Sequence, residues 1–92
     1  MKINKKLTNF FSSLGDETRL KILISLRKSK KNVNDIHKEI NNITLSAISH
    51  QLKYLENNDI VLYEKKGKEK IYQLNGEFCW CILNDAITHF KD

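Results

Sequence analysis

Proline is absent from this 92-residue chain, and glycine occurs only three times. The sequence therefore lacks the proline-rich or glycine-rich stretches that mark flexible linkers, and it contains no repeat or low-complexity tract. Residues 1–92 are predicted to form a single domain with one modest hydrophobic core. The small size also favours completion of that core by a second subunit.

Long apolar segments are missing as well. No apolar run approaches the roughly 18 residues of a membrane-spanning helix, and the N-terminus has no apolar signal region. We therefore expect a soluble, cytoplasmic protein without a membrane partner. Cys79 and Cys81 are expected to be reduced in that compartment, where disulfides are rare.

Signs of catalysis are equally scarce. There is no glycine-rich phosphate loop, and no nucleophile is accompanied by a suitably placed base. The histidines, His37, His50 and His89, lie on separate segments. We predict that the protein is not an enzyme.

Acidic residues are outnumbered, with 11 Asp and Glu against 16 Lys and Arg and a formal net charge of +5. This excess favours a polyanionic partner. Its distribution is more informative, because lysines gather at 5–6, 28–31 and 65–70 and leave the apolar segments almost uncharged. Basic loops around a neutral helix are typical of DNA-binding domains, in which phosphate contacts position a helix that contacts bases.

Hydrophobic periodicity predicts three helices in the first half of the chain. The first should span Asn4–Ser13 and end before Gly15. The second should begin after an N-cap at Asp16 and be largely buried. A short third helix is predicted over Asp35–Ile40, with Asn34 as its N-cap.

The stretch Thr44–Asn57 carries the most distinctive pattern. A helix here would place a narrow apolar stripe of Ile48, Leu52 and Leu55 against the core. Its opposite face would present small hydrogen-bonding groups and one cation: Ser46, Ser49, His50 and Lys53. An ordinary surface helix is the alternative, but such helices usually mix Glu with Lys. With the helix before it, this segment predicts a helix-turn-helix whose second helix enters the major groove.

The periodicity changes to two after the helix-turn-helix, which predicts a hairpin. Strands are expected over 60–65 and 71–74, and Gly67 would supply the positive φ that the tip needs. The region of the tip carries four lysines: Lys65, Lys66, Lys68 and Lys70. We expect this hairpin to be a wing that contacts phosphates. The alternative role of the lysines is solubility and protection of a strand edge.

The last segment, Glu77–Phe90, has apolar residues at helical spacing on more than one side. A terminal helix with one face in water would not need so many large apolar residues. We therefore predict a fifth helix, part of which contacts another subunit.

In this order the segments resemble the ArsR/SmtB family of winged helix-turn-helix repressors. The resemblance rests on Leu14–Leu23 (LGDETRLKIL), Ser46–Leu55 (SAISHQLKYL) and the basic hairpin that ends in Ile71–Leu74 (IYQL). It implies a mainly α (α+β) fold of four helices, a two-stranded hairpin and a fifth helix. It also implies a homodimer joined through the first and last helices, which binds inverted-repeat operators in double-stranded DNA until an inducer releases it.

The resemblance does not extend to the family's metal sites. Where one site has a Cys-x-Cys-Asp motif, this chain has Asn32–Asp35 (NVND), so both thiolate ligands are missing. At a second site, in the last helix, the matching positions are Gly76 and Phe78, which cannot bind metal, and His89 and Asp92, which can. Only half of that site is present.

Three interpretations of Cys79 and Cys81 stay open. Residues two apart on a helix point about 200° apart around its axis, so a disulfide within one chain would require the helix to open. The first interpretation is that both cysteines are inert apolar side chains beside Trp80. The second is a thiol-based redox switch. The third is a zinc-like ion at the dimer interface, held together with His89 and Asp92. The sequence itself requires no cofactor.

The leading hypothesis is a homodimeric, sequence-specific DNA-binding repressor. The predicted DNA-contacting residues are Ser46, Ala47, Ser49, His50, Gln51 and Lys53 on the helix and Lys65, Lys66, Lys68 and Lys70 on the hairpin. The alternative is a protein-interaction module that keeps the winged-helix shape. It is less favoured because the face of the helix lacks the exposed aromatic anchors of protein interfaces.

Overall fold

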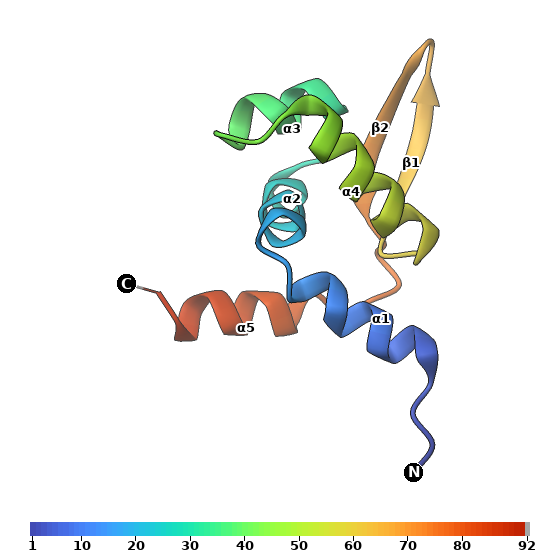
Figure 1. Ribbon diagram of the computed structural model, residues 1–92, viewed down its shortest axis with the longest axis vertical. Helices are drawn as coiled ribbons and strands as arrows, with labels where there is room; N and C mark the ends of the chain where they lie inside the picture. Colours follow the sequence, from blue (N-terminus) through green and yellow to red (C-terminus); the bar gives the residue numbers. More distant parts are fainter. Residues whose placement is uncertain (92) are drawn as a thin grey trace.

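The computed structural model describes residues 1–91, which form five helices and one two-stranded antiparallel sheet (Figure 1). In chain order the elements are α1 (Lys5–Leu14), α2 (Glu17–Lys28), α3 (Val33–Glu39), α4 (Leu45–Asn57), β1 (Val61–Lys66), β2 (Glu69–Leu74) and α5 (Cys81–His89). Helices α1 and α5 lie along one side of the molecule, whereas α3, α4 and the hairpin lie on the other, with α2 between them (Figure 1). The predicted winged helix-turn-helix fold is confirmed.

The core lies around α2, on which α4 and the base of the hairpin pack. It draws its buried apolar side chains from α2 to α5 and from the hairpin: Ile22, Leu23, Leu26, Ile36, Ile40, Ile48, Leu52, Leu55, Ile60, Val61, Tyr72 and Leu83. The predicted apolar stripe of α4 is therefore confirmed as the surface that attaches this helix to the core. Within residues 1–91, every helix is too short or too polar to cross a lipid bilayer.

Two asparagines determine where α1 and α3 begin. Asn4 is the N-cap of α1, and its side chain accepts a hydrogen bond from the N–H of Lys6 at 2.7 Å. The prediction of Asn34 as the N-cap of α3 is wrong, because Asn32 takes that position and accepts the N–H of Asp35 at 2.8 Å. A helix that starts at Val33 places this apolar residue against the core, which favours the earlier cap.

Helix α5 begins at Cys81 and ends at His89, so the predicted span Glu77–Phe90 is too long. The cause is a turn around Asn75, whose side-chain Oδ1 accepts the N–H of Glu77 at 3.0 Å. The Asn75 carbonyl also accepts the indole N–H of Trp80 at 2.9 Å. These bonds satisfy a buried asparagine and hold the chain out of the helix until Cys81.

Candidate nucleic-acid interface

Helix α4 is held at both ends by local hydrogen bonds. Thr44 is its N-cap, and the Thr44 hydroxyl accepts an N–H of the first turn at 3.1 Å. At the other end, Asp59 has a left-handed φ of 58°. The N–H groups of Asp59 and Ile60 donate to the carbonyls of Glu56 and Leu55 at 3.1 and 2.9 Å. This pair of bonds is a Schellman motif, which ends the helix and turns the chain into β1.

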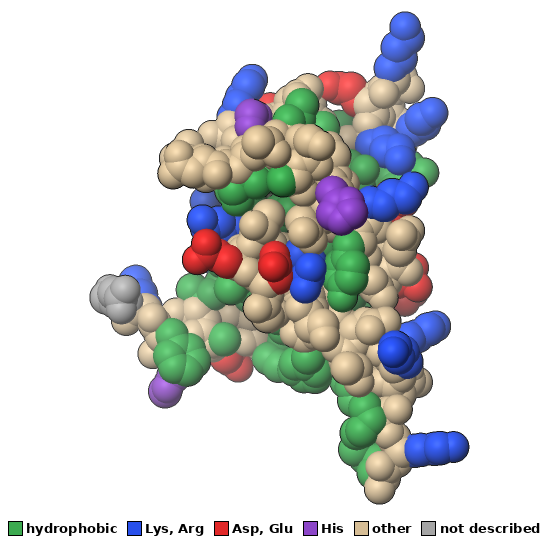
Figure 2. Space-filling model, viewed as in Figure 1, with side chains coloured by type: hydrophobic (Ala, Val, Ile, Leu, Met, Phe, Trp, Pro, Cys, Tyr) green, Lys and Arg blue, Asp and Glu red, His purple; other side chains and the backbone are tan. Residues whose placement is uncertain are grey.

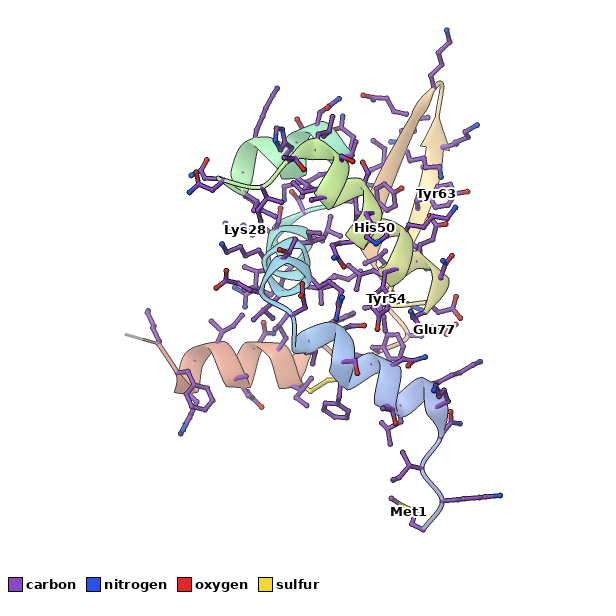
Figure 3. The ribbon with its side chains drawn as sticks, viewed as in Figure 1. Met1, Lys28, His50, Tyr54, Tyr63 and Glu77 are labelled. Atoms are coloured by element: carbon purple, nitrogen blue, oxygen red, sulfur yellow. A yellow bond between two sulfur atoms is a disulfide. The ribbon has the colours of Figure 1, made fainter. Side chains whose placement is uncertain are left out.

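The outward face of α4 carries the residues that the sequence predicts to contact DNA. Four of them are exposed, and their side chains point away from the core: Ser46, Ser49, His50 and Lys53. Ala47 is half-buried at the edge of this face. His50 lies on the surface of α4 on the side of the hairpin (Figure 3). The first turn of α4 contains no acidic residue, so nothing there repels a phosphate.

Gln51 has a different position from the other predicted residues of α4. It is half-buried, and its Oε1 accepts a hydrogen bond from Nη1 of Arg19 at 3.1 Å. The acceptor atom of this side chain is therefore occupied within the chain. A contact between Gln51 and DNA stays a prediction.

The hairpin ends in a tight turn. Lys66 pairs with Glu69, which leaves Gly67 and Lys68 as a two-residue loop. Gly67 has a φ of 64°, as the sequence predicts. A positive φ at the first of two loop residues matches the twist of the strands and is most accessible to glycine.

The predicted wing lysines differ in their surroundings. Lys65, Lys66 and Lys68 are exposed, whereas Lys70 is half-buried with its Nζ 4.3 Å from the centre of the Tyr63 ring. Figure 2 shows Lys and Arg side chains projecting along the edge that the hairpin forms. The three exposed lysines are free to follow a phosphate backbone, and Lys70 is held by the cation–π contact.

A hollow of about 320 Å³ separates α4 from the wing. Its walls include Ser49 from α4, Asn34 from α3 and three lysines of the hairpin, Lys65, Lys68 and Lys70. A nucleic-acid strand that passed between α4 and the wing would meet hydroxyl and amide groups on one side and cations on the other. The residues that the sequence predicts for the helix and the wing thus meet at one concave surface.

Two contacts that the sequence patterns did not predict hold the wing against the helix-turn-helix. Lys31 and Tyr72 form an antiparallel bridge, with N–H to carbonyl distances of 3.0 and 2.8 Å. The side-chain amide of Asn32 donates to the Glu69 carboxylate at 2.9 Å. Burial raises the pKa of the Tyr72 phenol above its ordinary value.

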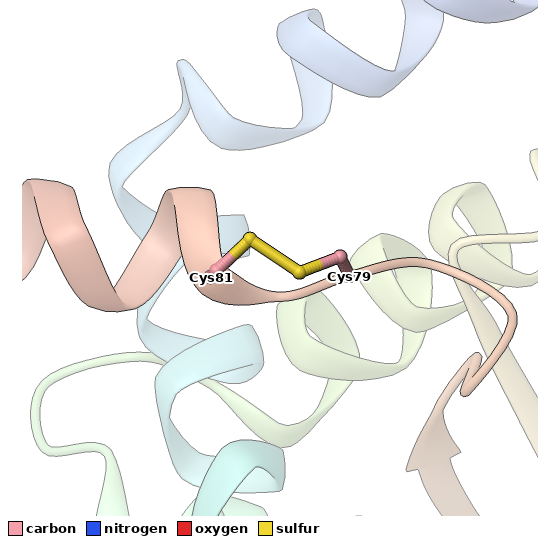
Figure 4. The surroundings of a disulfide bond; sticks show 2 residues. All are labelled: Cys79 and Cys81. Atoms are coloured by element: carbon pink, nitrogen blue, oxygen red, sulfur yellow. A yellow bond between two sulfur atoms is a disulfide. The ribbon is translucent and has the colours of Figure 1, made fainter.

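Cys79 and Cys81 form a disulfide, with Cα atoms 5.4 Å apart (Figure 4). The expectation that both thiols are reduced is therefore wrong. The helical geometry that argued against a bond within one chain does not apply, because α5 begins only at Cys81 and Cys79 lies in the preceding segment. Both residues are exposed, which also contradicts their interpretation as buried apolar side chains beside Trp80.

The described residues do not assemble a metal site. Within residues 1–91, no three His, Cys, Asp or Glu side chains are grouped so that they could hold an ion. His89 is exposed in the last turn of α5, and Asp92 lies outside the described residues. The disulfide also removes Cys79 and Cys81 as thiolate ligands. A zinc ion shared by two subunits stays a prediction.

Comparisons with known proteins agree with this geometry. The family model described as bacterial regulatory protein, arsR family, matches residues 16–63, which include α2, α3, α4 and the first residues of β1. The chain is 33% identical over 82 residues to the transcriptional repressor SdpR of Bacillus subtilis. The aligned residues cover 89% of this chain and 86% of that protein.

Two further matches extend the likeness to most of the chain. The transcriptional repressor SmtB homolog of Synechocystis is 26% identical over 88 residues, which cover 96% of this chain and 66% of that protein. Among solved structures, the transcriptional repressor BigR from Xylella fastidiosa has a TM-score of 0.83 and 23% identity, covering 95% of this chain and 88% of that one. The likeness to BigR concerns the fold.

Proposed function

Because this chain belongs to the ArsR family of bacterial regulatory proteins, we propose that it is a homodimeric repressor that binds an inverted-repeat operator in double-stranded DNA. Family membership makes it a DNA-binding transcriptional regulator. The observation that supports the finer proposal is the exposed, almost uncharged face of α4 beside a wing with three exposed lysines.

The proposed roles follow from the chemistry of the side chains. The hydroxyls of Ser46 and Ser49 and the imidazole of His50 can both donate and accept hydrogen bonds, as base edges in the major groove require. Lys53 and the wing lysines would contact phosphates, which supply affinity and position the helix but carry no sequence information. Lys65, Lys66 and Lys68 are the wing lysines free to do so.

An apolar surface on α1, α5 and the adjoining chain supports the proposed dimer. Its exposed side chains are Ile3, Leu7, Phe11, Ile82 and Phe90. A hollow of about 550 Å³ is lined mainly by apolar residues of α1, α2 and α5. A second hollow, of about 520 Å³, is lined by both apolar and polar residues of α1, the turn between α4 and β1, and the segment that leads into α5. A second copy packed here would remove these side chains from water. The two α4 helices would then reach half-sites about one helical turn or more apart.

Replacing His50 with alanine is expected to relax sequence preference and leave binding to random DNA nearly unchanged. A base contact of this kind is worth about 1–3 kcal/mol of discrimination. The measurement compares affinity for a duplex that the wild type selects from a randomised library with affinity for a random duplex. His37→Ala is the control, because His37 lies on α3 and is half-buried. Equal losses of His50→Ala on both duplexes would contradict the assigned role.

We also propose that the Cys79–Cys81 pair responds to thiol redox state. The residues around it pack on α1: the ring centres of Phe78 and Trp80 lie 5.3 and 6.0 Å from that of Phe10. A low-molecular-weight dithiol would reduce the bond, so that the protein gains two protons and two electrons and the reagent becomes a disulfide. The covalent restraint beside the proposed dimer surface would then be lost.

Reduction is expected to weaken binding to the selected duplex by about fivefold or more, the lower range of coupling between distant sites. The double variant Cys79→Ser, Cys81→Ser should have one affinity under both conditions. Affinity is measured before and after dithiol treatment, with a chelator present to separate thiol chemistry from metal binding. Unchanged wild-type affinity after verified reduction would exclude this switch.

A further inference from the structure

One flank of α4 lies between its exposed outward face and the stripe that packs on the core. Gln51 and Tyr54 lie three residues apart, so they share this flank, and Asn58 continues it at the C-cap. All three are half-buried. The flank faces α2 and α1, so its contacts determine how the helix is oriented relative to the proposed dimer surface.

Arg19 joins this flank to two other helices. From the first turn of α2, its Nη1 donates to Gln51 Oε1 at 3.1 Å, and its Nη2 donates to the Ser12 carbonyl at 3.0 Å. Its guanidinium carbon lies 4.3 Å from the centre of the Tyr54 ring. One side chain therefore contacts α1, which carries part of the apolar surface, and α4, which carries the candidate DNA contacts.

The charge of Arg19 suits the end of α1. The last turn of α1 contains no basic residue of its own, and the carbonyls there form the negative end of the helix dipole. The Ser12 carbonyl, which accepts the Arg19 bond, belongs to this turn. Arg19 thus supplies from α2 the positive charge that α1 lacks.

A second polar contact joins the same two helices. The side-chain amide of Asn9 on α1 donates to Oδ1 of Asn58 at 2.9 Å. The amide of Asn58 in turn donates to the carbonyl of Tyr54 at 2.9 Å. Helices α1 and α4 are therefore connected at two places, and a change in the position of α1 would act on α4 through both.

We propose that Arg19 is a positioning residue for DNA recognition: it fixes α4 to α1 and so sets the orientation of the two α4 helices in the dimer. This inference deepens the proposed function and rests on it. Lysine cannot replace the arginine, because an ammonium lacks the planar fork that donates to Gln51 and Ser12 while the guanidinium lies against Tyr54. The Nε–H of Arg19 is buried and finds no acceptor within residues 1–91. A buried donor without an acceptor costs free energy, which the other contacts of Arg19 must offset.

The test compares Arg19→Met and Arg19→Lys with wild type on three kinds of duplex: the selected operator, operators with one base pair added to or removed from the spacer, and random DNA. Methionine keeps much of the aliphatic stem and removes every polar contact. Both variants are expected to lose about tenfold in affinity for the operator and to bind random DNA within twofold of wild type. They should also discriminate less between the three spacer lengths, because an α4 that is no longer fixed to α1 can adjust to half-sites at different separations.

Arg27→Met is the matched control. Arg27 also lies on α2, but its Nη1 donates to Asn84 of α5 and not to α4. A role of Arg19 in stability alone would lower the urea midpoint and the active fraction for all duplexes equally. It would leave the ratio of operator to random binding and the spacer preference unchanged. That result, or an equal change in Arg27→Met, would overturn the inference.

A measurement without DNA separates this inference from the proposed function. Amide hydrogen exchange of Arg19→Met should be about tenfold faster in the last turns of α4 and unchanged in α3, whereas Arg27→Met should match wild type. If the wild type selects no operator, the proposed function fails, and exchange alone decides whether Arg19 holds α4. Unchanged protection of α4 in Arg19→Met would overturn the positioning role.

Discussion

Replacing Leu52 with alanine is expected to lower the free energy of unfolding by about 2–5 kcal/mol, because it removes a fully buried side chain and leaves a cavity. Leu52 is 1% exposed, and with Ile48 and Leu55 it forms the stripe that attaches α4 to the core. Domains of this size have a total stability of about 5–15 kcal/mol, so a large part of it would be lost. Urea unfolding measures the change.

Leu45→Ala provides the control on the same helix. Leu45 is 40% exposed, so the same substitution there should cost much less, within about 1 kcal/mol. Equal destabilisation by the two variants would mean that α4 is not attached to the core through its predicted stripe. DNA binding of Leu52→Ala should fall with the folded fraction and recover on cooling or in stabilising salts.

Replacing Lys65, Lys66 and Lys68 together with glutamine is expected to weaken binding to operator and random DNA alike, by about a hundredfold or more at low salt. Each lost phosphate contact should reduce the slope of log affinity against log salt concentration by about one unit. The reason is that a lysine on a phosphate displaces condensed counterions without distinguishing the bases. Binding titrations over a series of salt concentrations give the slope.

Lys91→Gln is the matched control, since Lys91 comes shortly after α5 in the chain. Helix α5 lies on the other side of the molecule from the hairpin (Figure 1). It should leave the salt slope unchanged. A triple variant that lost specificity and kept its salt slope would show that the wing lysines contact bases or act only on solubility. Lys70→Gln is expected to have a smaller effect, because its ammonium is already held against Tyr63.

The helices and strands whose apolar residues follow a periodic pattern could be predicted from the sequence. Apolar spacing located α2 and the stripe of α4, and the change to a period of two located the hairpin. The glycine at its tip has the φ that the turn needs, 64°. The exposure of Ser46, Ser49 and His50 also followed from their position opposite the stripe.

The parts that depend on single polar side chains could not be predicted in this way. Asn32 and Asn34 are equally good caps, and only the packing of Val33 distinguishes them. The end of α4 has Asp59 where glycine is the usual signal for a left-handed residue. The start of α5 is set by Asn75, which accepts hydrogen bonds from Glu77 in the turn and from Trp80 just before the helix.

Contacts between distant segments were also beyond the sequence patterns. The bridge between Lys31 and Tyr72 and the contact between Arg19 and Gln51 join residues that are 41 and 32 positions apart, and neither has a local signal. The disulfide was missed for a related reason. The helical geometry assumed for Cys79 and Cys81 fails where the helix starts late.

Footprinting on the duplex that the wild type selects from a randomised library is the most direct test of a homodimer that binds an inverted-repeat operator. The proposed function predicts two protected major-groove segments related by a two-fold axis and about one helical turn or more apart. It also predicts that His50→Ala removes the selection at the same positions in both segments. A single protected segment, a footprint without two-fold symmetry, or a wild-type protein that selects no sequence at all would contradict the account.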